Sequence, residues 1–480
     1  MAKSKNYVAV DLGAESGRVV LGTIAGDGRI SLREVRRFPN GPLQTRDGLF
    51  WDFERIAAEV ERGMEACIST CPVIDGIGVD SWGVDFGLLD QEGKLLANPR
   101  HYRDPSNAAA MRQVHEIIPK DDLYLRTGIQ LLPFNTLYQL YGLSLRSPDL
   151  MQAASRLLMI PDLVNHRLSG SDKGEYTIAS TSQMLDPFTR SWAVDLLRKL
   201  GLRTDILPEI VEPGAFLGEH SGIPVIATCC HDTASAVAGV PMESPDALYI
   251  SCGTWAVVGV VVPEPVINDL TLRHNFTNEG GYQAIRLLRN VTGLWLVQQC
   301  RSEWEAEGRT YTYDELTRLA RASEHFRSII DPDSPEFLEP GPMTHRIAAY
   351  CGRTNQPVPE WPGEFVRTAL ESIALRIRWT VDRLSEILGR GLDMAHIVGG
   401  GSRNPLLCQL VADALGMPVT AGPVEATCAG NILVIGLATG VYSTLAEARS
   451  AVSRSLDLVR YDPRDTVGSA YERFLALVTS

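Results

Sequence analysis

The sequence lacks both an excess of basic residues and any long hydrophobic run. Its 45 lysines and arginines are outnumbered by 58 aspartates and glutamates, which gives a formal net charge of −13. Such a chain does not offset the many phosphates of a nucleic acid, so we expect no nucleic-acid partner and only a local site for any polyanion. No apolar stretch approaches the roughly 18 residues of a membrane span, so we expect no membrane partner.

The sequence also lacks the patterns of a disulfide framework, a zinc site and a signal peptide. Its nine cysteines lie mostly in apolar runs, and the pair Cys67 and Cys71 has no second Cys or His pair nearby. A chain of 480 residues builds its core without disulfides, which favours buried free thiols. Lys3 and Lys5 precede an apolar stretch that Asp11 soon interrupts. We therefore expect a cytoplasmic protein.

The length and the alternation of patterns predict a mixed α/β protein of two to four domains. Ile223 to Cys229 is typical of a buried strand, and a helix is expected from His231 to Ala238. Glu364 to Leu388 has apolar residues at helical spacing and stops at Gly389. The segment Val240 to Pro245 has the composition of a linker, so we predict domains over 1–242 and 243–480.

The opening stretch, Tyr7 to Ile30, reads YVAVDLGAESGRVVLGTIAGDGRI. Its first glycine turn is not a P-loop, which needs Gly-Lys-Ser/Thr, and it is not a dinucleotide fingerprint, which runs into a helix. Val19 to Ile24 is rich in β-branched residues and is soon interrupted by Gly26-Asp27-Gly28. The stretch therefore predicts a hairpin meander.

A weak internal repeat begins at Asp246, where DALYISCGTWAVVGVVV has the same outline of strand, short glycine turn and strand. The second copy has Ser251 to Thr254 where the first has Asp11 to Ala14. The geometry can therefore repeat while the acid does not. We expect only the first half to hold a metal ion.

Asp11 closes a predicted strand beside the first glycine turn. A carboxylate there suits Mg²⁺ next to phosphate oxygens, held directly or through water. The alternative is a turn aspartate that bonds its own backbone. Arg18 could contact a phosphate or be a solvated hairpin residue. Glu15 repels a phosphate unless it points away or helps to hold the metal.

Gly399-Gly400-Gly401 connects a predicted strand, Ala395 to Val398, to a predicted helix, Pro405 to Leu415. Such a turn lets the backbone approach a nucleotide and offers amide donors. A tight turn with no ligand is the alternative. Asn404 stands where the dinucleotide fingerprint has glycine, which disfavours a dehydrogenase.

Asp232 follows a predicted strand and opens a helix of small residues, His231-Asp232-Thr233-Ala234-Ser235. It can be a helix N-cap, or it can be the base that takes a proton from a hydroxyl as the oxygen attacks a phosphoryl group. His231 beside it can bind substrate or be a satisfied core histidine.

Asp80-Ser81-Trp82-Gly83-Val84-Asp85 follows another predicted strand and combines an aromatic ring with two acids. Sugar sites have this composition, and so do many strand ends. Asn290 and Gln298 are eight residues apart and could share a helical face, whereas Trp295 between them is expected in the core.

Taken together and in order, these pieces resemble the FGGY carbohydrate kinases. The resemblance covers nearly the whole chain, from Val8 to Asn404 and on through AGPVEATCAGNI. It rests on the motifs VAVDLGAESGRV, IGVDSWGVDFGLLD, GIQLLPFNTLYQL, HDTASAV, SCGTW, TNEGG, NVTGLWLVQ and HIVGGGSRN. The segment HYRDP, from His101 to Pro105, departs from the Trp-x-Asp-x-Arg pattern of related pentulose kinases, which implies a different sugar.

The resemblance implies two actin-like, ribonuclease-H-like lobes with an ATP-binding cleft between them, the N-terminal lobe binding sugar and the C-terminal lobe ATP. It implies that Asp232 is the catalytic base, that Asp11 lies at the metal and phosphates, and that Thr254 meets the transferred phosphate. For ATP it implies Ala14, Glu15, Ser16, Gly17 and Arg18 at the phosphates and Gly400 and Gly401 near adenosine. For the sugar it implies Gly83, His231, Thr233, Asn290 and Gln298.

Within that family the motifs resemble those of members that phosphorylate L-rhamnulose at its 1-hydroxyl. We therefore expect an enzyme that uses ATP and Mg²⁺ to make L-rhamnulose 1-phosphate. The alternatives are a kinase of L-fuculose or another ketose, a sugar sensor that transfers no phosphate, and an actin-like ATPase acting on protein partners. A sensor needs neither Asp11 nor Asp232, and no obvious partner-binding extension supports the ATPase.

Overall fold

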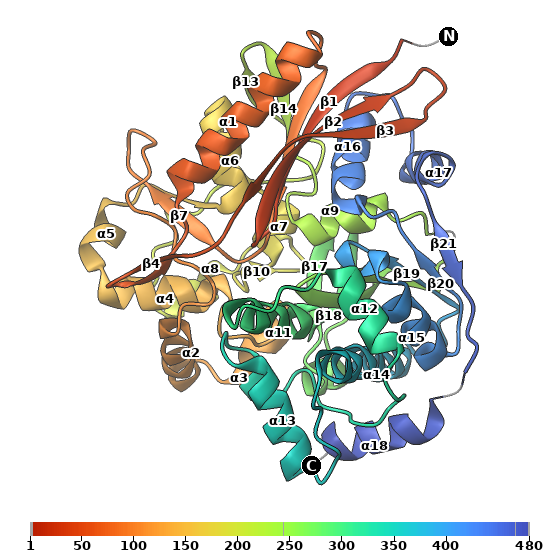
Figure 1. The fold of residues 1–480 in the computed structure, drawn as a ribbon. Coiled ribbons are helices and arrows are strands. Elements are labelled where there is room, and N and C mark those ends of the chain that lie inside the picture. The colour runs from red at the N-terminus through yellow and green to blue at the C-terminus, as the bar shows by residue number, and fades with distance from the viewer. Residues whose placement is uncertain (1–2, 243, 466, 479–480) are drawn as a thin grey trace. The chain divides into compact units, whose positions relative to one another are not determined.

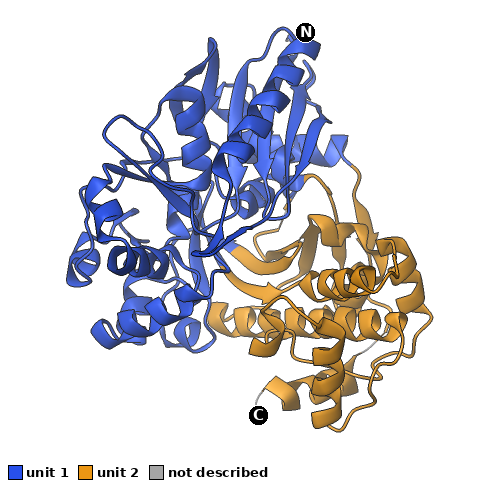
Figure 2. Ribbon diagram, turned by 60° about the vertical axis from the view of Figure 1, so that its left-hand side comes forward, with its two compact units in different colours: residues 1–241, 261–287, 426–456 blue, residues 242–260, 288–425, 457–480 orange. Residues whose placement is uncertain are grey.

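The computed structural model describes residues 3–242, 244–465 and 467–478 and contains two compact units. Unit 1 comprises residues 1–241, 261–287 and 426–456, and unit 2 comprises residues 242–260, 288–425 and 457–480 (Figure 2). The chain therefore first leaves unit 1 after Pro241 and returns to it twice.

Unit 1 is built around a six-stranded sheet (Figure 1). In spatial order its strands are β13 (Phe216–His220), β14 (Ile223–Ile226), β6 (Gly76–Ser81), β1 (Lys5–Leu12), β2 (Ser16–Ile24) and β3 (Ile30–Pro39). Its helices are α1 (Phe53–Thr70), α2 (Ser106–Ile117), α3 (Lys120–Thr127), α4 (Thr136–Arg146), α5 (Pro148–Ala153), α6 (Ile160–Ser169), α7 (Tyr176–Ser180), α8 (Val194–Lys199), α9 (Asp232–Gly239), α10 (Asp269–Arg273), α16 (Ala426–Ala438) and α17 (Leu445–Ser455).

Four two-stranded sheets complete the strands of unit 1. They pair β4 (Leu43–Thr45) with β5 (Gly48–Phe50), β7 (Phe86–Leu89) with β8 (Arg156–Met159), β9 (Gly174–Glu175) with β12 (Ile210–Val211), and β10 (Leu185–Asp186) with β11 (Ser191–Trp192).

The second large sheet has seven strands, most of which belong to unit 2. In spatial order they are β17 (Thr277–Gly281), β18 (Ala284–Thr292), β16 (Trp255–Val262), β15 (Ala247–Cys252), β19 (Met394–Val398), β20 (Val419–Ala421) and β21 (Val459–Tyr461). The helices of unit 2 are α11 (Trp295–Ala306), α12 (Tyr313–Arg321), α13 (Met343–Arg353), α14 (Pro362–Leu388), α15 (Pro405–Leu415) and α18 (Gly468–Val478), with the short helices η1 (Pro335–Phe337) and η2 (Gly400–Arg403).

The predicted meander and its repeat are both present. β1 pairs antiparallel with β2, which pairs antiparallel with β3, and β6 lies parallel to β1. In the second sheet β15 pairs antiparallel with β16, and β19 lies parallel to β15. The same local topology, a hairpin with a parallel neighbour beside its first strand, thus occurs twice in the chain.

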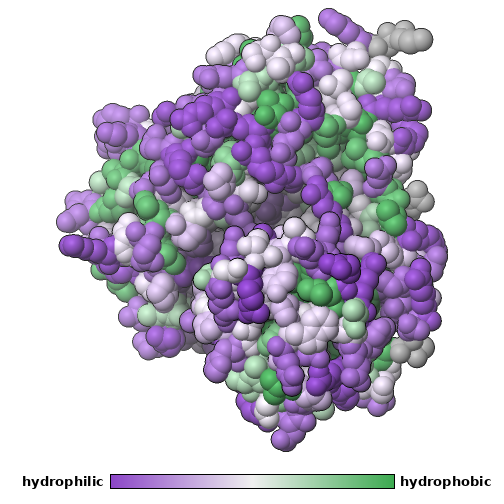
Figure 3. All heavy atoms as spheres, in the orientation of Figure 1, coloured by the Kyte–Doolittle hydropathy of each residue, from purple (hydrophilic) through white to green (hydrophobic). Residues whose placement is uncertain are grey.

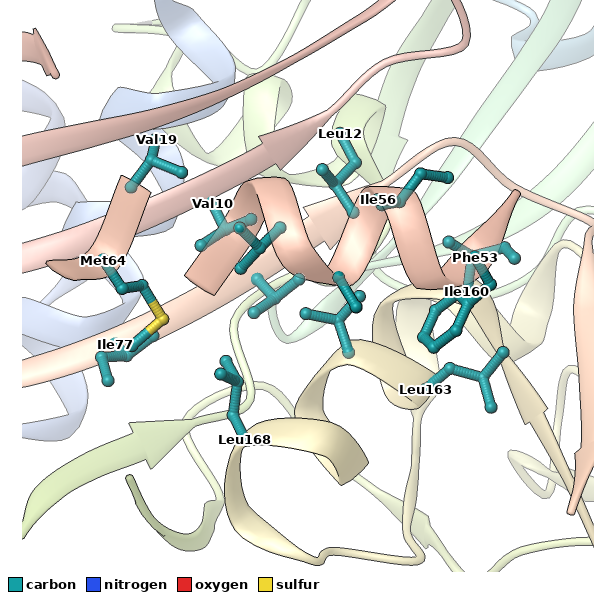
Figure 4. Close-up of a cluster of buried hydrophobic side chains, with 14 of the residues drawn as sticks. Val10, Leu12, Val19, Phe53, Ile56, Met64, Ile77, Ile160, Leu163 and Leu168 are labelled. Carbon is teal, nitrogen blue, oxygen red and sulfur yellow. The ribbon is translucent and has the colours of Figure 1, made fainter. Parts of the chain in front are cut away.

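Alternation along β1 decides which of its side chains meet which helix. Val8, Val10 and Leu12 belong to the cluster that α1 covers, together with Val19 of β2 and Phe53, Ile56 and Met64 of α1 (Figure 4). Tyr7 and Ala9 point to the opposite face, where they pack with Cys428, Ala429 and Ile432 of α16. Asp11 follows the same alternation and therefore faces α16, where Cys428 contacts it.

The local sequence of α1 explains where this helix begins and which face it buries. Asp52 caps its first turn by accepting from the amide of Arg55, and its apolar residues recur every three or four positions. Its buried residues are Phe53, Ile56, Ala57, Val60, Gly63, Met64 and Cys67. The Cys67 thiol belongs to this core, and all nine cysteines are free, as predicted.

Helices α9 and α16 of unit 1 approach each other very closely. A Cβ atom added to Gly430 of α16 would lie 1.7 Å from the carbonyl oxygen of Ser235 in α9 and 2.9 Å from the amide of Gly239. Only glycine therefore fits at Gly430. This contact holds in place the helix that begins at Asp232.

Within the described part of the chain, no helix combines the length and the apolar character that a membrane crossing requires. On the face shown in Figure 3, hydrophilic side chains predominate and hydrophobic ones form small separate patches.

Candidate active site

Three chain segments of unit 1 meet at the end of β1, at the end of β6 and just before α9. The amide of Trp82 donates to the carbonyl of Leu12 at 3.2 Å, and the amide of Ser81 donates to the carbonyl of Cys230 at 2.9 Å. Ser81 and His231 form an isolated parallel bridge. The predicted residues Asp11, Gly83, His231 and Asp232 therefore lie on adjoining segments, although they are far apart in sequence.

Asp232 is the first residue of α9, and the residue that caps this helix is His231, which makes no side-chain cap bond. One carboxylate oxygen of Asp232, Oδ1, carries all its contacts. It accepts from the amide of Thr233 and from Thr233 Oγ1 at 3.0 Å, and it lies 3.4 Å from His231 Nε2. Among the described residues, nothing hydrogen-bonds to Oδ2. Because His231 is the cap residue, the N-cap alternative for Asp232 is wrong, and Oδ2 of Asp232 keeps its capacity to accept a hydrogen bond.

The environment of Asp232 favours the proton-accepting role. Burial raises the pKa of its carboxyl, and the negative charge of Asp11 raises it further, while His231 and the Thr233 bonds counteract part of the shift. The side chain keeps 31% of its surface exposed, so a substrate can still reach it. The result is a more basic carboxylate than an ordinary aspartate, on an accessible helix end.

Asp11 does not bond its own backbone, so the turn-aspartate alternative is wrong. It lies opposite Arg18 in the β1–β2 register, and its Oδ2 accepts from Arg18 Nε at 2.8 Å and Nη2 at 2.6 Å. The Cys428 thiol lies 3.5 Å from the same oxygen. Its Oδ1 accepts no bond from any residue that the structure describes. The side chain is 8% exposed, so Arg18 is held by a largely buried ion pair and is not a free solvated residue.

The fit of this corner to Mg²⁺ rests on its carboxylates. Mg²⁺ is commonly held by one or two carboxylates together with water and phosphate oxygens, and Asp11 offers Oδ1. Asp80 of β6 lies beside Asp11 in the parallel register, and its Oδ2 accepts from Asn431 Nδ2 at 2.6 Å. Burial, and then the charge of Asp11, raise the pKa of Asp80 well above its ordinary value. No group of three or more His, Cys, Asp or Glu side chains that could hold a metal occurs in the described ranges.

The turn that follows Asp11 is short and tied down. The amide of Gly13 donates to the carbonyl of Ser16 at 3.0 Å, and Asn40 Nδ2 donates to the carbonyl of Gly13 at 2.9 Å. Of the residues predicted at the phosphates, Ala14 and Glu15 lie in the turn. The others, Ser16, Gly17 and Arg18, are already part of β2.

The segment around Gly83 is fixed by hydrogen bonds between Val84 and two threonine side chains. The amide of Val84 donates to Thr181 Oγ1 at 3.1 Å, Thr136 Oγ1 donates to the carbonyl of Val84 at 2.6 Å, and Val84 has a left-handed φ of 70°. Trp82 is buried, with its Nε1 donating to Asp85 Oδ2 at 3.0 Å. Its ring therefore packs in the core of unit 1.

Unit 2 brings several of its own predicted residues together. The amides of Gly293 and Trp295 each donate to the carbonyl of Thr254 at 3.2 Å, which ties the turn between β15 and β16 to the start of α11. Gly399 has a left-handed φ of 76°, and a Cβ on Gly401 would lie 2.6 Å from Cys252 Sγ. The loop with Gly400 and Gly401 is thus packed against the end of β15.

The prediction that Asn290 and Gln298 share a helical face is wrong. Asn290 lies on β18, whereas Gln298 lies on α11. Gly293 and Leu294 separate the two elements, because the strand ends at Thr292 and the helix begins at Trp295. Trp295 is 9% exposed and lies in the core, as predicted.

Sequence reasoning missed Glu279 of β17 and Arg286 of β18, which contact His231. The side chain of Arg286 is completely buried and that of Glu279 is 8% exposed. Opposite charges seven residues apart in apolar strand sequence are the available signal, because charged side chains are buried only when paired. The pattern does not reveal that a histidine from another segment joins them.

Similarity to known proteins extends over nearly the whole chain. The family model "FGGY family of carbohydrate kinases, N-terminal domain" matches residues 6–239, and the corresponding C-terminal domain matches 248–439. A rhamnulokinase of Bacteroides thetaiotaomicron is 40% identical, covering 98% of this chain and 99% of the relative. A rhamnulokinase of Oceanobacillus iheyensis is 37% identical, covering 95% and 97%. The crystal structure of Plasmodium falciparum glycerol kinase with ADP has a TM-score of 0.79 at 16% identity, covering 100% and 98%, which shows a shared fold.

Proposed function

Because this chain belongs to the FGGY family of carbohydrate kinases, we propose that it transfers the γ-phosphoryl group of ATP to the 1-hydroxyl of L-rhamnulose, giving L-rhamnulose 1-phosphate and ADP. The observation that carries the choice of sugar is the similarity to curated rhamnulokinases at 37–40% identity over nearly the full length of both chains. The partners are two small molecules, the sugar and ATP, and we place the reaction in the cytoplasm.

Asp232 is the general base of this proposal. Its Oδ1 accepts the two bonds from Thr233 and lies 3.4 Å from His231 Nε2, so Oδ2 is the atom that accepts the proton of the 1-hydroxyl as the oxygen attacks phosphorus. The raised pKa of this carboxyl makes it a better proton acceptor than an ordinary aspartate. The phosphoryl group passes to the sugar oxygen, and the electron pair of the broken bond leaves with ADP.

Phosphoryl transfer also requires groups that bind the ATP phosphates and offset their negative charge. We assign Arg18 to the phosphate oxygens, and Asp11 through Oδ1 to Mg²⁺, directly or through water. When bound, Mg²⁺ neutralises phosphate charge and orients the γ-phosphoryl group. The ion pair with Asp11 fixes the Arg18 guanidinium before any ligand arrives, which lowers the ordering cost of phosphate binding.

The remaining assignments follow the family resemblance. Gly83, His231, Thr233, Asn290 and Gln298 bind the sugar, and Thr254 meets the transferred phosphoryl group. Ala14, Glu15, Ser16 and Gly17 surround the ATP phosphates. Gly400 and Gly401 lie on the adenosine side.

The decisive experiment measures ADP release by the purified protein with MgATP and a panel of ketoses. The panel contains L-rhamnulose, L-fuculose, L-ribulose and D-xylulose, with a control lacking sugar. We expect the highest kcat/KM with L-rhamnulose and little release without sugar. A higher kcat/KM with L-fuculose or another ketose would overturn the proposed substrate. Release that does not depend on sugar would indicate an ATPase, and no release with any sugar would contradict the kinase assignment.

A further inference from the structure

Three charged or ionisable side chains of unit 1 form a chain of contacts that ends at Asp232. Arg286 Nη2 lies 2.9 Å from His231 Nδ1 and 3.0 Å from Glu279 Oε2. On the far side of the imidazole, His231 Nε2 lies 3.4 Å from Asp232 Oδ1. Each ring nitrogen of His231 therefore has its own charged neighbour.

The arginine determines where the His231 ring carries its proton. A guanidinium has only donors, so a hydrogen bond from Arg286 requires a lone pair on Nδ1. A neutral ring that accepts at Nδ1 carries its hydrogen on Nε2. Glu279 Oε2 lies 3.3 Å from Nδ1 and could accept a proton from that nitrogen. In that case two N–H groups would face each other at 2.9 Å, so the shorter arginine contact decides the tautomer.

Arg286 is held firmly in this position. Its Nε donates to the carbonyl of Gly280 at 2.7 Å, and its side chain is wholly buried. Glu279 Oε2 accepts from Arg286 Nη2 at 3.0 Å, so the two buried charges are paired with each other. The Nη1 atom of Arg286 has no partner among the described residues. An unsatisfied buried donor is costly, so stability alone does not explain this arginine.

We propose that Arg286, held by Glu279, is a positioning residue that keeps the proton of His231 on Nε2. The protonated Nε2 then faces Asp232 Oδ1 at 3.4 Å, and this contact, with the bonds from Thr233, reserves Oδ2 for the substrate hydroxyl. The functional consequence rests on the proposed role of Asp232 as the base. The tautomer itself does not depend on that role.

The other charged groups around this chain come from several elements. Asp11 of β1 and Asp80 of β6 act on Asp232 and on each other. Glu175, at the end of β9, accepts from the amide of Cys230 at 3.0 Å, and Thr177 Oγ1 accepts from the amide of His231 at 3.2 Å. Asp11, Asp80 and Glu175, which surround His231 and Asp232, are all acidic, so Arg286 is the cation in direct contact with the imidazole.

The test is a direct reading of the tautomer by ¹⁵N NMR of histidine-labelled protein without ligands. Because the chain has nine histidines, a His231→Gln variant identifies the signal. In the wild type we expect the shifts of an unprotonated Nδ1 and a protonated Nε2. In Arg286→Met we expect Nδ1 to gain a proton, which it donates to Glu279. Arg286→Lys, which can still donate to Nδ1, should keep much of the wild-type pattern.

The turnover of the Arg286 variants is the second measurement that tests the positioning role. Arg286→Met should lower kcat about 10- to 100-fold, as is typical when a group that orients a functional histidine is lost. Arg449→Met is the matched control, because Arg449 is a part-buried arginine of unit 1 that donates to the carbonyls of Val237 and Ala238. It should leave the His231 signal unchanged.

Two NMR results would overturn the proposal: a wild-type ring that carries its proton on Nδ1, or an Arg286→Met variant with the wild-type tautomer. The wild-type measurement decides even if the variant does not fold. Because no sugar is present, a failure of the L-rhamnulose assignment leaves the NMR result interpretable. Conversely, the expected tautomer with a fully active Asp232→Asn variant would contradict the proposed base and leave the tautomer intact.

Discussion

Arg18 lies directly opposite Asp11 in the β1–β2 hairpin and donates two hydrogen bonds to one oxygen of its carboxylate, at 2.8 and 2.6 Å. The other oxygen of Asp11 accepts no bond from the described residues. One cross-strand pair thus presents a fixed positive charge and a free carboxylate oxygen at the same strand end. We expect the pair to serve a magnesium–phosphate complex, because Mg²⁺ binds carboxylate oxygens and arginine binds phosphate oxygens.

We expect Arg18→Met to raise KM for MgATP and to lower kcat/KM about 10- to 100-fold, because a charged hydrogen bond to phosphate is worth about 1.5–3 kcal/mol. Steady-state kinetics with varied MgATP measure the change. Arg29→Met, which removes an arginine with 66% of its side chain exposed, is the control and should behave as wild type. An unchanged KM for MgATP in Arg18→Met would contradict the assignment of Arg18 to phosphate.

Asp232→Asn should lower kcat about 10²- to 10⁴-fold, the usual contribution of a general base. The amide oxygen can replace Oδ1 in its bonds with Thr233, so the fold and the melting temperature should change little. The control is Asp314→Asn, which alters another aspartate in the first turn of a helix, α12. Near-normal turnover of Asp232→Asn would exclude Asp232 as the base.

The pH dependence follows from the direction of the Asp232 shift. The base must be ionised, so activity is lost as pH falls through its pKa, and burial raises that pKa above the ordinary value. We expect the acid limb of kcat/KM to lie clearly above pH ~3.9, the usual aspartate value. A profile of kcat/KM against pH, with stability checked at each pH, measures it. A limb at or below that value would contradict the raised pKa.

Gly430→Ala should destabilise the protein by about 1–3 kcal/mol, the usual cost of overpacking. The new methyl would lie 1.7 Å from the carbonyl oxygen of Ser235, so α9 and α16 must separate. Because α9 begins at Asp232, activity should fall as well. Urea unfolding and ADP release measure the two effects.

The matched control is Gly352→Ala in α13, where an added Cβ meets no atom within 4 Å. This variant should be neutral or more stable by up to ~1 kcal/mol, since alanine favours a helix more than glycine does. If Gly430→Ala were as stable as Gly352→Ala, the close approach of α9 and α16 would be wrong.

Local elements were predictable because their patterns are local. The meander of β1, β2 and β3 follows from β-branched runs between glycine turns. Helix α14 begins two residues before the predicted start and ends at Leu388, where Gly389 adopts a left-handed conformation. Helix α15 has the predicted bounds, because Asn404 caps it and Gly416 ends it. Caps, periodicity and stop signals need no information from distant residues.

Contacts between distant segments were not predictable in the same way. Asn290 and Gln298 have helical spacing, yet pairing within the sheet draws Asn290 into β18. The sequence does not show that Glu279 and Arg286 meet His231, because that contact depends on how three segments pack. Helix α16 is apolar on most of its surface, which predicts burial without saying where.

The sequence by itself determined the strand, turn and helix that carry Asp11 and Asp232, since these depend on neighbours along the chain. Only the tertiary structure decided which face of the sheet Asp11 occupies, which oxygen of Asp232 stays free, and which nitrogen of His231 meets an arginine. Those features follow from the burial of charged groups, and a buried charge is tolerated only where packing supplies a partner.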